Sequence, residues 1–320
     1  MKYKMKKRNF KYYFVLIGIF LVSTLVKAQQ DPQYTQYMYN MNVINPAYAT
    51  DNSGVINLGG LYRTQWVGAV GAPKTATLFA HSPIAKRVEM GVSFINDAIG
   101  DVVNENNIYV DFAYVLPVSE KNKLSFGIKG GATFFNTNFS GFQFTDPDFD
   151  FAFENNINEV FPNVGVGTFF FGENYYLGLS APNLLTTKHI NSKNGIKTTG
   201  VEEIHYFFTG GYVFDLNSNL KFKPAFMTKA VSGAPLSVDV TTNFLINNKL
   251  ELGAGYRFDD SVSGLVNFYV LPNLRVGYSY DYTLSNLGRY NSGTHEIFLL
   301  FDLDTSSLSS KGFEKSPRFF

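Results

Sequence analysis

The sequence predicts an all-β protein: a transmembrane antiparallel β-barrel of about fourteen strands, preceded by a non-strand segment. Three observations lead to this fold class. The chain has 32 Phe, 20 Tyr and 28 Gly but a single Trp, and aromatic and β-branched residues favour strands. Its alternating runs have the length of a tilted membrane strand, about 9–11 residues. Aromatic side chains recur near the ends of these runs, as in the interfacial girdles of outer-membrane barrels.

The first 28 residues have the pattern of a Sec-type signal peptide, which is removed on export. A basic stretch opens the chain, an apolar run spans 12–26, and Val26 and Ala28 fit a small-residue cleavage site before Gln29. The alternative is a membrane anchor, but the run is shorter than the roughly 20 residues that a spanning helix needs. The chain has no Cys, which excludes disulfides, a lipid anchor on Cys and thiol chemistry.

The charge argues against nucleic acid as a partner. The full chain has 27 Lys and Arg against 26 Asp and Glu, and residues 1–28 hold seven of the basic residues and no acidic one. The remaining chain therefore has 20 basic and 26 acidic residues, a net charge of −6. Nucleic-acid-binding proteins present basic surfaces. No apolar stretch after residue 28 is long enough for a spanning helix.

From residue 53 onward, short alternating runs are separated by Asn, Asp, Gly and Pro. In 249–260, Leu250 and Leu252 share one face while Glu251 and Arg257 share the other. A soluble sandwich would bury the apolar face, whereas an outer-membrane barrel turns it to lipid. Strand length and aromatic placement favour the barrel, although 12 or 16 strands would also fit. The predicted strands cover 54–66, 75–84, 87–96, 106–117, 122–134, 160–171, 174–181, 203–215, 219–230, 235–246, 249–259, 261–271, 273–283 and 293–303.

The connections fall into two lengths, which predicts their side of the membrane. Short connections suit the periplasm and long ones the cell surface. The loop 136–160 is acidic and rich in Phe, so it either contacts a partner or folds over the mouth of the barrel. The predicted organisation is a signal peptide (1–28), an N-terminal non-strand segment (29–52), the barrel (53–304) and a Ser-rich periplasmic tail (305–320).

The alternation also places charged side chains inside the barrel. Because buried charges should be paired, we expect either a salt-bridged lattice that holds the barrel shape or the lining of a solute path. Trp66, at the end of the first predicted strand, is expected to be an interfacial anchor. The candidate lumen charges are Arg63, Glu89, Asp111, Lys129, Asp239, Arg257, Asp281 and Glu296.

The sequence offers no motif for catalysis or for a cofactor. His81, His189, His205 and His295 are its four histidines, and none lies in a serine-elbow, HExxH or Cys–His setting. We therefore expect no enzyme activity, no cofactor and no metal, and no small-molecule substrate is indicated. A barrel enzyme would need a Ser–His pair near the outer rim.

Several motifs resemble one known family. They are "QDPQYTQYMYNMNVINPAYAT" (30–50), "GLYRTQWVGAVGAPKT" (60–75), "HSP" (81–83), "SAPNLL" (180–185) and "YSYDYTLSNLGRYNSGTHEIFL" (278–299). Together they are similar to the PorP/SprF family of the Bacteroidetes type IX secretion system over almost the whole chain after residue 28. The resemblance implies an integral outer-membrane barrel that serves protein secretion and gliding motility. Its implied partners are the outer-membrane lipid, a secreted adhesin client and periplasmic components of the secretion system.

The stretch before the first strand is uncharged, rich in Tyr and without a steady period. Asn and Pro disfavour regular structure there, while tyrosines offer apolar rings with polar tips that suit a semi-polar lumen. We expect the segment to pack into the periplasmic mouth or lumen as a plug; the alternative is a docking strand for a periplasmic partner. The candidate residues are Asp31, Pro32, Tyr34, Tyr37, Tyr39, Asn40, Asn45, Pro46 and Tyr48.

Two main functions are thus left open by the sequence. One is a barrel that supports the export or surface attachment of a large adhesin-type client. The other is a passive porin or a hydrophobic-solute channel of the outer membrane. The two differ in the lumen, because a channel should conduct, whereas a scaffold should be blocked by its own N-terminal segment.

Overall fold

The computed structural model describes residues 32–139, 156–185, 188–193, 196–201 and 203–305. The predicted signal peptide, Asp31, most of the loop 136–160 and almost all of the predicted tail lie outside these residues. The strands are β1 (Val55–Thr64), β2 (Pro73–Ala85), β3 (Val88–Ile99), β4 (Val103–Pro117), β5 (Lys123–Thr137), β6 (Asn158–Phe171), β7 (Tyr175–Ala181), β8 (Lys188–Lys193), β9 (Ile196–Val201), β10 (His205–Tyr212), β11 (Phe214–Asn217), β12 (Leu220–Val231), β13 (Ser237–Ile246), β14 (Leu250–Arg257), β15 (Ser261–Leu271), β16 (Leu274–Thr283) and β17 (Thr294–Asp304).

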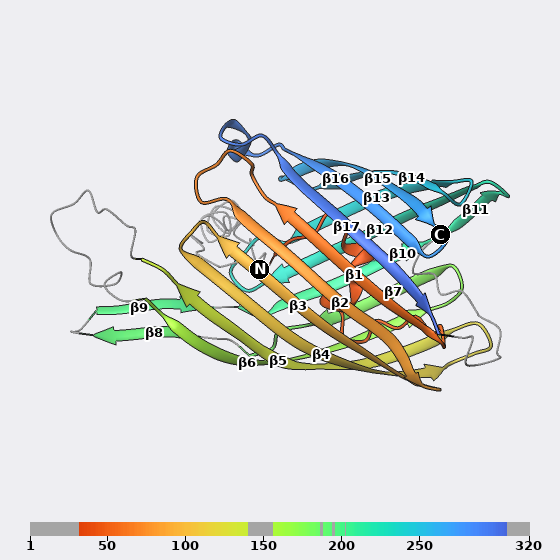
Figure 1. The fold of residues 1–320 in the computed structure, drawn as a ribbon, viewed down its shortest axis with the longest axis horizontal. Helices are drawn as coiled ribbons and strands as arrows, with labels where there is room; N and C mark the ends of the chain where they lie inside the picture. Colours follow the sequence, from red (N-terminus) through yellow and green to blue (C-terminus); the bar gives the residue numbers. More distant parts are fainter. Residues whose placement is uncertain (1–31, 140–155, 186–187, 194–195, 202, 306–320) are drawn as a thin grey trace, which may run out of the picture.

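These strands close into an antiparallel barrel (Figure 1). Each wall strand pairs with its neighbours in the sequence, and β1 pairs with β17 to close the ring, with Val55 opposite Asp304. β10 pairs with both β7 and β12, while β11 continues the same wall position after a break at Val213 and pairs with β12 alone. Within the described residues the wall therefore has fourteen strands. The predicted fold class is confirmed.

The two faces of the wall differ as the alternation predicted. Successive side chains of a strand point to opposite faces, and along β15 the burial alternates residue by residue from Ser261 to Phe268. Large apolar side chains such as Leu78, Ile128 and Phe268 are exposed on the outside. Charged side chains such as Arg63 and Glu296 are buried on the inside. An apolar exterior and a polar interior are what a lipid-facing barrel requires.

The two ends of the barrel carry different connections. At the end where β1 begins and β17 ends, called here the short-turn end, successive strands are joined through 86–87, 118–122, 172–174, 218–219, 247–249 and 272–273. The opposite, long-loop end carries 65–72, 100–102, 138–157, 182–204, 232–236, 258–260 and 284–293. The stretch 182–202, expected to be a plain loop, contains the β8–β9 hairpin, which projects from the long-loop end (Figure 1).

A row of aromatic rings follows the outside of the wall near the short-turn end. Tyr212 stacks on Tyr175 with ring centroids 6.4 Å apart and contacts Phe214 at 4.4 Å. The row continues through Phe222 to Phe244, at centroid distances of 6.0 Å and 4.8 Å. Such a row matches the aromatic girdle predicted from the strand ends.

Residues 32–51, called here the N-terminal segment, form no strand. They contain the 3₁₀ turn η1 (Tyr37–Tyr39) and the one-turn helix α2 (Met41–Ile44). This is slightly more regular structure than expected, since a single turn around Asn42 still forms, with the Asn45 N–H donating to Met41 O at 2.8 Å. Another 3₁₀ turn, η3 (Asn286–Arg289), lies in the loop before β17. No helix in the described part of the chain is long and apolar enough to cross a membrane.

Candidate functional site: the N-terminal segment in the barrel lumen

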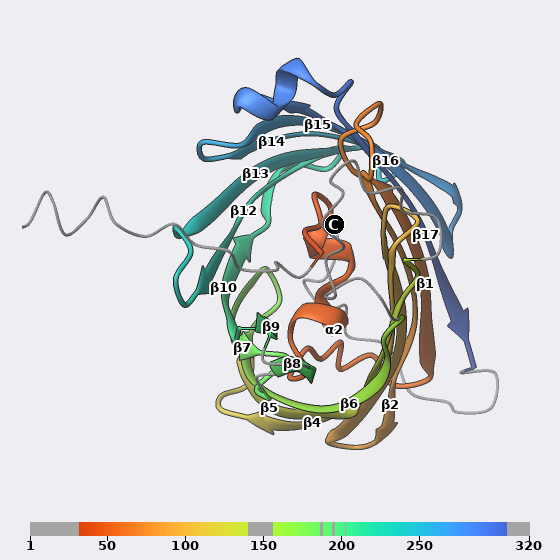
Figure 2. The same ribbon diagram turned by 90° about the vertical axis from the view of Figure 1, so that its left-hand side faces the viewer.

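The N-terminal segment runs through the inside of the barrel, as the view along the barrel shows (Figure 2). Every residue from Tyr34 to Thr50 is buried. The main hydrophobic cluster of the protein also lies here, because rings and aliphatic side chains of the segment pack against inward residues of the wall such as Phe79, Phe169 and Phe298. The lumen, rather than a space between two sheets, is therefore the core of this protein.

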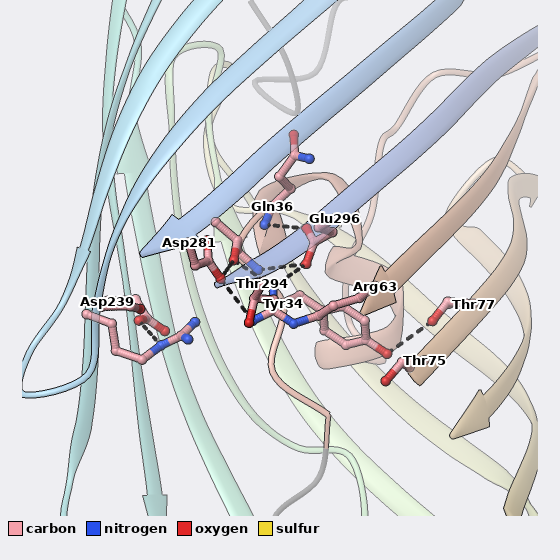
Figure 3. Close-up of polar contacts among 12 residues, drawn as sticks. Tyr34, Gln36, Arg63, Thr75, Thr77, Asp239, Asp281, Thr294 and Glu296 are labelled. Carbon is pink, nitrogen blue, oxygen red and sulfur yellow. Dashed lines mark hydrogen bonds and ion pairs between the residues drawn. The ribbon is translucent and has the colours of Figure 1, made fainter. Parts of the chain in front are cut away.

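The start of the N-terminal segment is held near the long-loop end by a buried cluster (Figure 3). Arg63 Nη2 lies 2.9 Å from Asp281 Oδ2, and its Nη1 lies 3.0 Å from Glu296 Oε2. Thr35 Oγ1 donates to Asp281 at 2.6 Å and accepts from Arg63 at 2.8 Å. Glu296 also accepts the main-chain N–H groups of Thr35 at 3.0 Å and Gln36 at 2.8 Å. One arginine thus faces two carboxylates, and two main-chain amides supply the remaining donors.

The next part of the segment crosses to the wall formed by β12 to β16. The Tyr37 hydroxyl lies 3.4 Å from Thr241 Oγ1. The Tyr39 hydroxyl donates to Glu251 and accepts from Arg275 Nη2 at 2.8 Å. Arg275 and Glu251 also form an ion pair with each other.

Two basic side chains lie against the ring of Tyr39. Arg275 Cζ lies 4.3 Å and Lys223 Nζ 4.9 Å from the ring centroid. A tyrosine ring attracts cations through its π face, so the Arg275 guanidinium stabilises this position of the ring. At the start of the segment, by contrast, the carboxylate of Glu296 faces main-chain N–H donors.

The middle of the segment then lies against β5, β6 and β7. Lys129 Nζ donates to Val43 O at 2.6 Å, and Ser180 Oγ donates to Ile44 O at 2.8 Å. Asn45 Nδ2 donates to Thr168 O at 3.0 Å. All three bonds connect a wall strand to a segment that satisfies few of its own main-chain groups.

Two paired glycines make room for this contact. Gly127 on β5 lies opposite Gly167 on β6. A β-carbon at Gly127 would overlap Pro46 O and the Ala47 main-chain nitrogen, and one at Gly167 would overlap Asn45 Oδ1. The missing side chains therefore let the Pro46–Ala47 backbone and the Asn45 side chain lie directly on the wall.

The end of the N-terminal segment is held near the short-turn end by a second carboxylate. Glu89 accepts the main-chain N–H groups of Thr50 at 2.8 Å and Asp51 at 2.6 Å. His81 Nε2 lies 2.6 Å from the same carboxylate, and its ring packs against Tyr48 at 5.3 Å between centroids. Asp51 pairs with Lys123 at the start of β5. The segment therefore spans the lumen between Glu296 and Glu89, each of which binds two consecutive main-chain amides.

Comparison with known proteins adds the family. Residues 26–301 match the family described as type IX secretion system membrane protein PorP/SprF. The chain belongs to the PorP/SprF family. No curated protein sequence gives a significant match. The resemblance read from the sequence motifs is thereby confirmed.

Solved structures similar to this PorP/SprF protein are outer-membrane barrels. The CymD monoaromatic hydrocarbon channel has 11% identity over 87% of this chain and 94% of that chain, with a TM-score of 0.50. The Ralstonia pickettii toluene transporter TbuX has 10% identity over 82% and 93%, with a TM-score of 0.49. Omp33 of Acinetobacter baumannii has 11% identity over 79% and 98%, with a TM-score of 0.43. These likenesses concern the fold alone. Family and fold make this chain an integral outer-membrane protein.

The structure of this PorP/SprF protein brings most of the candidate lumen charges into pairs. Arg63 meets Asp281 and Glu296, as described above. Arg257 Nε lies 2.5 Å from Asp239 Oδ1, and Lys129 Nζ lies 3.7 Å from Asp111 Oδ1. The side chains named from the segment are buried in the lumen, except that Pro32 is half-buried and Asp31 lies outside the described residues.

Glu251, Arg275 and Lys223 are among the buried charged residues that were not in the set of candidate lumen charges. Their signal was present, because each alternates with apolar neighbours on its strand. Trp66 lies beyond the end of β1, with a left-handed φ of 45°, so the strand alternation expected to reach it stops at Thr64. Its indole is half-buried, and its main-chain N–H donates to Thr294 Oγ1 at 3.1 Å.

A cavity remains beside the N-terminal segment. It is lined by Pro32 and Ile44 of the segment and by wall residues that include Phe207, Met227 and Lys229. Most of the wall residues that line it lie toward the long-loop end of their strands. The cavity is thus a remnant of the lumen between the segment and the long-loop mouth.

Proposed function

We propose that this protein is a non-enzymatic outer-membrane barrel of the type IX secretion and gliding machinery. Its role is to support the export or surface attachment of a large adhesin-type client. Membership of the PorP/SprF family supplies the secretion setting. The observation that favours a scaffold is the N-terminal segment, which occupies the lumen from Glu296 near one end to Glu89 near the other.

The N-terminal segment acts in this proposal as a plug. A passive channel needs a continuous water-filled path, whereas the segment fills this lumen with buried rings and ties itself to charges on several strands. The candidate lumen charges then have two tasks, holding the barrel shape and holding the segment. The alternative, a docking strand for a periplasmic partner, would require the segment to leave the lumen.

The plug is tested by crosslinking. The chain has no native Cys, so Tyr37→Cys and Thr241→Cys introduce a single pair of thiols. A short bis-maleimide should join them in native outer membranes, and the joined protein should stay non-conducting in a planar bilayer. A matched pair of Tyr37→Cys with the outward Thr242→Cys should not crosslink. Failure of the lumen pair to react would count against the plug.

A non-enzymatic role is also part of the proposal. His81 binds Glu89, which is occupied by main-chain amides of the segment, and His295 lies on the outside with Nδ1 2.7 Å from the Tyr278 hydroxyl. Both arrangements are structural. No group of three metal-ligating side chains is found in the described part of the chain.

The second candidate function is a passive porin or a hydrophobic-solute channel. Two observations favour it: the cavity between the segment and the long-loop mouth, and a barrel similar to that of a monoaromatic hydrocarbon channel. A channel should conduct or take up small apolar solutes with its N-terminal segment in place.

The deciding experiment is a gentle detergent extraction of the tagged protein from native outer membranes, followed by mass spectrometry. We expect one large secreted adhesin, periplasmic secretion components, or both to accompany it. An unrelated tagged barrel from the same membranes is the control for detergent carry-over. A protein that emerges alone and conducts ions in a planar bilayer would favour the channel.

A further inference from the structure

The wall of the lumen binds the main chain of the N-terminal segment at both ends and in the middle, in addition to side chains such as those of Thr35 and Tyr39. Glu296 accepts the N–H groups of Thr35 and Gln36, and Glu89 accepts those of Thr50 and Asp51. Between these ends, main-chain carbonyl groups accept hydrogen bonds from side chains of β5 and β7. Main-chain groups are common to all polypeptides, so these six contacts do not depend on the sequence of the occupant.

The glycine pair Gly127 and Gly167 supports the same reading. The missing side chain of Gly127 leaves room for the backbone of Pro46 and Ala47, and that of Gly167 leaves room for the side chain of Asn45. The contact at Gly127 is open to any main chain that passes equally close to the wall. The contact at Gly167 also involves an occupant side chain, because Asn45 Nδ2 donates to Thr168 O there.

A second observation shows that the resident segment fits imperfectly. The side-chain amides of Gln36 and Asn40 are fully buried, and neither has a hydrogen-bond partner within the described residues. On the wall, the side-chain amide of Asn243 is buried without a partner in the same part of the chain. Buried polar groups are normally satisfied by hydrogen bonds. Each unpartnered amide therefore weakens the binding of the resident segment relative to that of another occupant.

The N-terminal segment is joined to β1 by a short connection at the short-turn end of the barrel. Residues 52–54, between the segment and β1, are partly or fully exposed at the short-turn end. No residue of the segment from Pro32 to Thr50 carries a charged side chain, and the charge of Asp51 lies at the short-turn end, paired with Lys123. The buried part of the segment can therefore leave its site without exposing a charge of its own. The charges stay on the wall, where a second polypeptide can engage them.

We propose that the lumen is a binding site for a polypeptide segment that forms no strand and carries no charge over most of its length, and that the N-terminal segment is its resident occupant, which a client segment of the same chemistry displaces. This inference rests on the proposed function for the client. The occupant lies with its N-terminal side toward the long-loop end. Its main-chain amides meet Glu296 and Glu89, and an aromatic ring lies against Arg275 and Lys223.

The experiment makes the resident segment exchangeable after folding. A protease site inserted between Asn52 and Ser53 lets the full chain fold with its segment in place, and cleavage then removes the covalent link. A fluorescent synthetic peptide of residues 33–51 is added in excess to the cleaved, detergent-solubilised barrel. We expect saturable uptake of the label and release of the resident segment, detected by mass spectrometry. A cleaved segment that never exchanges would overturn the inference.

Two variant peptides test recognition of the main chain at a single position. Gln36→Pro removes the N–H that Glu296 accepts, whereas Gln36→Ala keeps it and removes only the unpartnered side-chain amide. We expect the Pro peptide to compete at least tenfold more weakly than the Ala peptide, and the Ala peptide to compete at least as well as the unaltered one. Equal competition by both variants would overturn main-chain recognition by Glu296.

The proposed function and the proposed lumen site can be disproved independently of each other. Extraction with the intact chain decides whether a client associates at all, and peptide exchange decides whether the lumen releases its occupant. If a client copurifies but the cleaved segment does not exchange, this inference is wrong and the proposed function still stands. If the segment exchanges but no client copurifies, the lumen is a binding site for a polypeptide, and its assignment to a client is wrong.

Discussion

Arg63 and Glu296 lie directly opposite each other across β1 and β17, the two strands that close the barrel. Arg63 Nη1 is 3.0 Å from Glu296 Oε2, and the two side chains are 2% and 0% exposed. The same carboxylate binds two main-chain amides of the N-terminal segment. A single buried ion pair therefore connects the closing seam of the barrel to the chain that fills it.

Removing the arginine should destabilise the barrel strongly. Arg63→Ala leaves Asp281 and Glu296 buried without their cation, and breaking a buried pair in this way costs about 3–5 kcal/mol. Denaturant unfolding in detergent should show this loss in the free energy of unfolding. The exposed Lys74 is the control, since Lys74→Ala should stay within about 0.5 kcal/mol of the wild type.

A rescue variant separates charge from packing. Adding Asp281→Asn and Glu296→Gln to Arg63→Ala removes the unpaired charges, so part of the lost stability should return. If the triple variant is no more stable than Arg63→Ala, packing around the arginine accounts for the effect, and the electrostatic argument is wrong.

The wall could be predicted from the sequence because its signal is local. Leu250, Glu251 and Leu252 point alternately outward and inward whatever the rest of the chain does. The break between β10 and β11 at Val213 left no such signal, because the alternating run continues through it. The β8–β9 hairpin was missed because its strands are only six residues long.

The sequence led us to expect the N-terminal segment in the mouth or lumen of the barrel, but it did not indicate which wall residues the segment contacts. Its composition suited a semi-polar lumen, but its contacts are long-range: Thr35 and Glu296 are 261 positions apart. A segment without a steady period carries no information about which wall residues it meets. The sequence did not predict the direction of the segment either, whose start lies near the long-loop end.

Adding one methyl group at Gly127 should loosen the segment. The β-carbon of Gly127→Ala would overlap Pro46 O and the Ala47 nitrogen, and overpacking of this kind costs about 1–3 kcal/mol. Gly130→Ala on the same strand is the matched control, because no atom lies within 4 Å of its new β-carbon. Crosslinking between Tyr37→Cys and Thr241→Cys should become slower in the first variant and be unchanged in the second. Equal rates in both would show that the segment does not rest on Gly127.

A charge on the outside of the wall should be costly only within the membrane. Ile128, in the middle of β5, and Val118, in the turn after β4, are 62% and 60% exposed. In a lipid-facing barrel, Ile128→Arg should destabilise by about 2–4 kcal/mol and Val118→Arg by about 0–1 kcal/mol. Unfolding titrations in lipid vesicles measure both. A protein whose outer face met water would tolerate the two substitutions equally.

The orientation of the barrel can be read from two serines at opposite ends of β12. Ser218 lies in the short turn before this strand and Ser232 in the connection after it, and both are exposed. Since short connections belong to the periplasm and long ones to the cell surface, a membrane-impermeant maleimide should label Ser232→Cys on intact cells. Ser218→Cys should react only after the outer membrane is permeabilised. The chain has no native Cys, so either signal comes from the introduced thiol alone. Labelling of Ser218→Cys on intact cells would reverse the barrel and point the start of the N-terminal segment toward the periplasm.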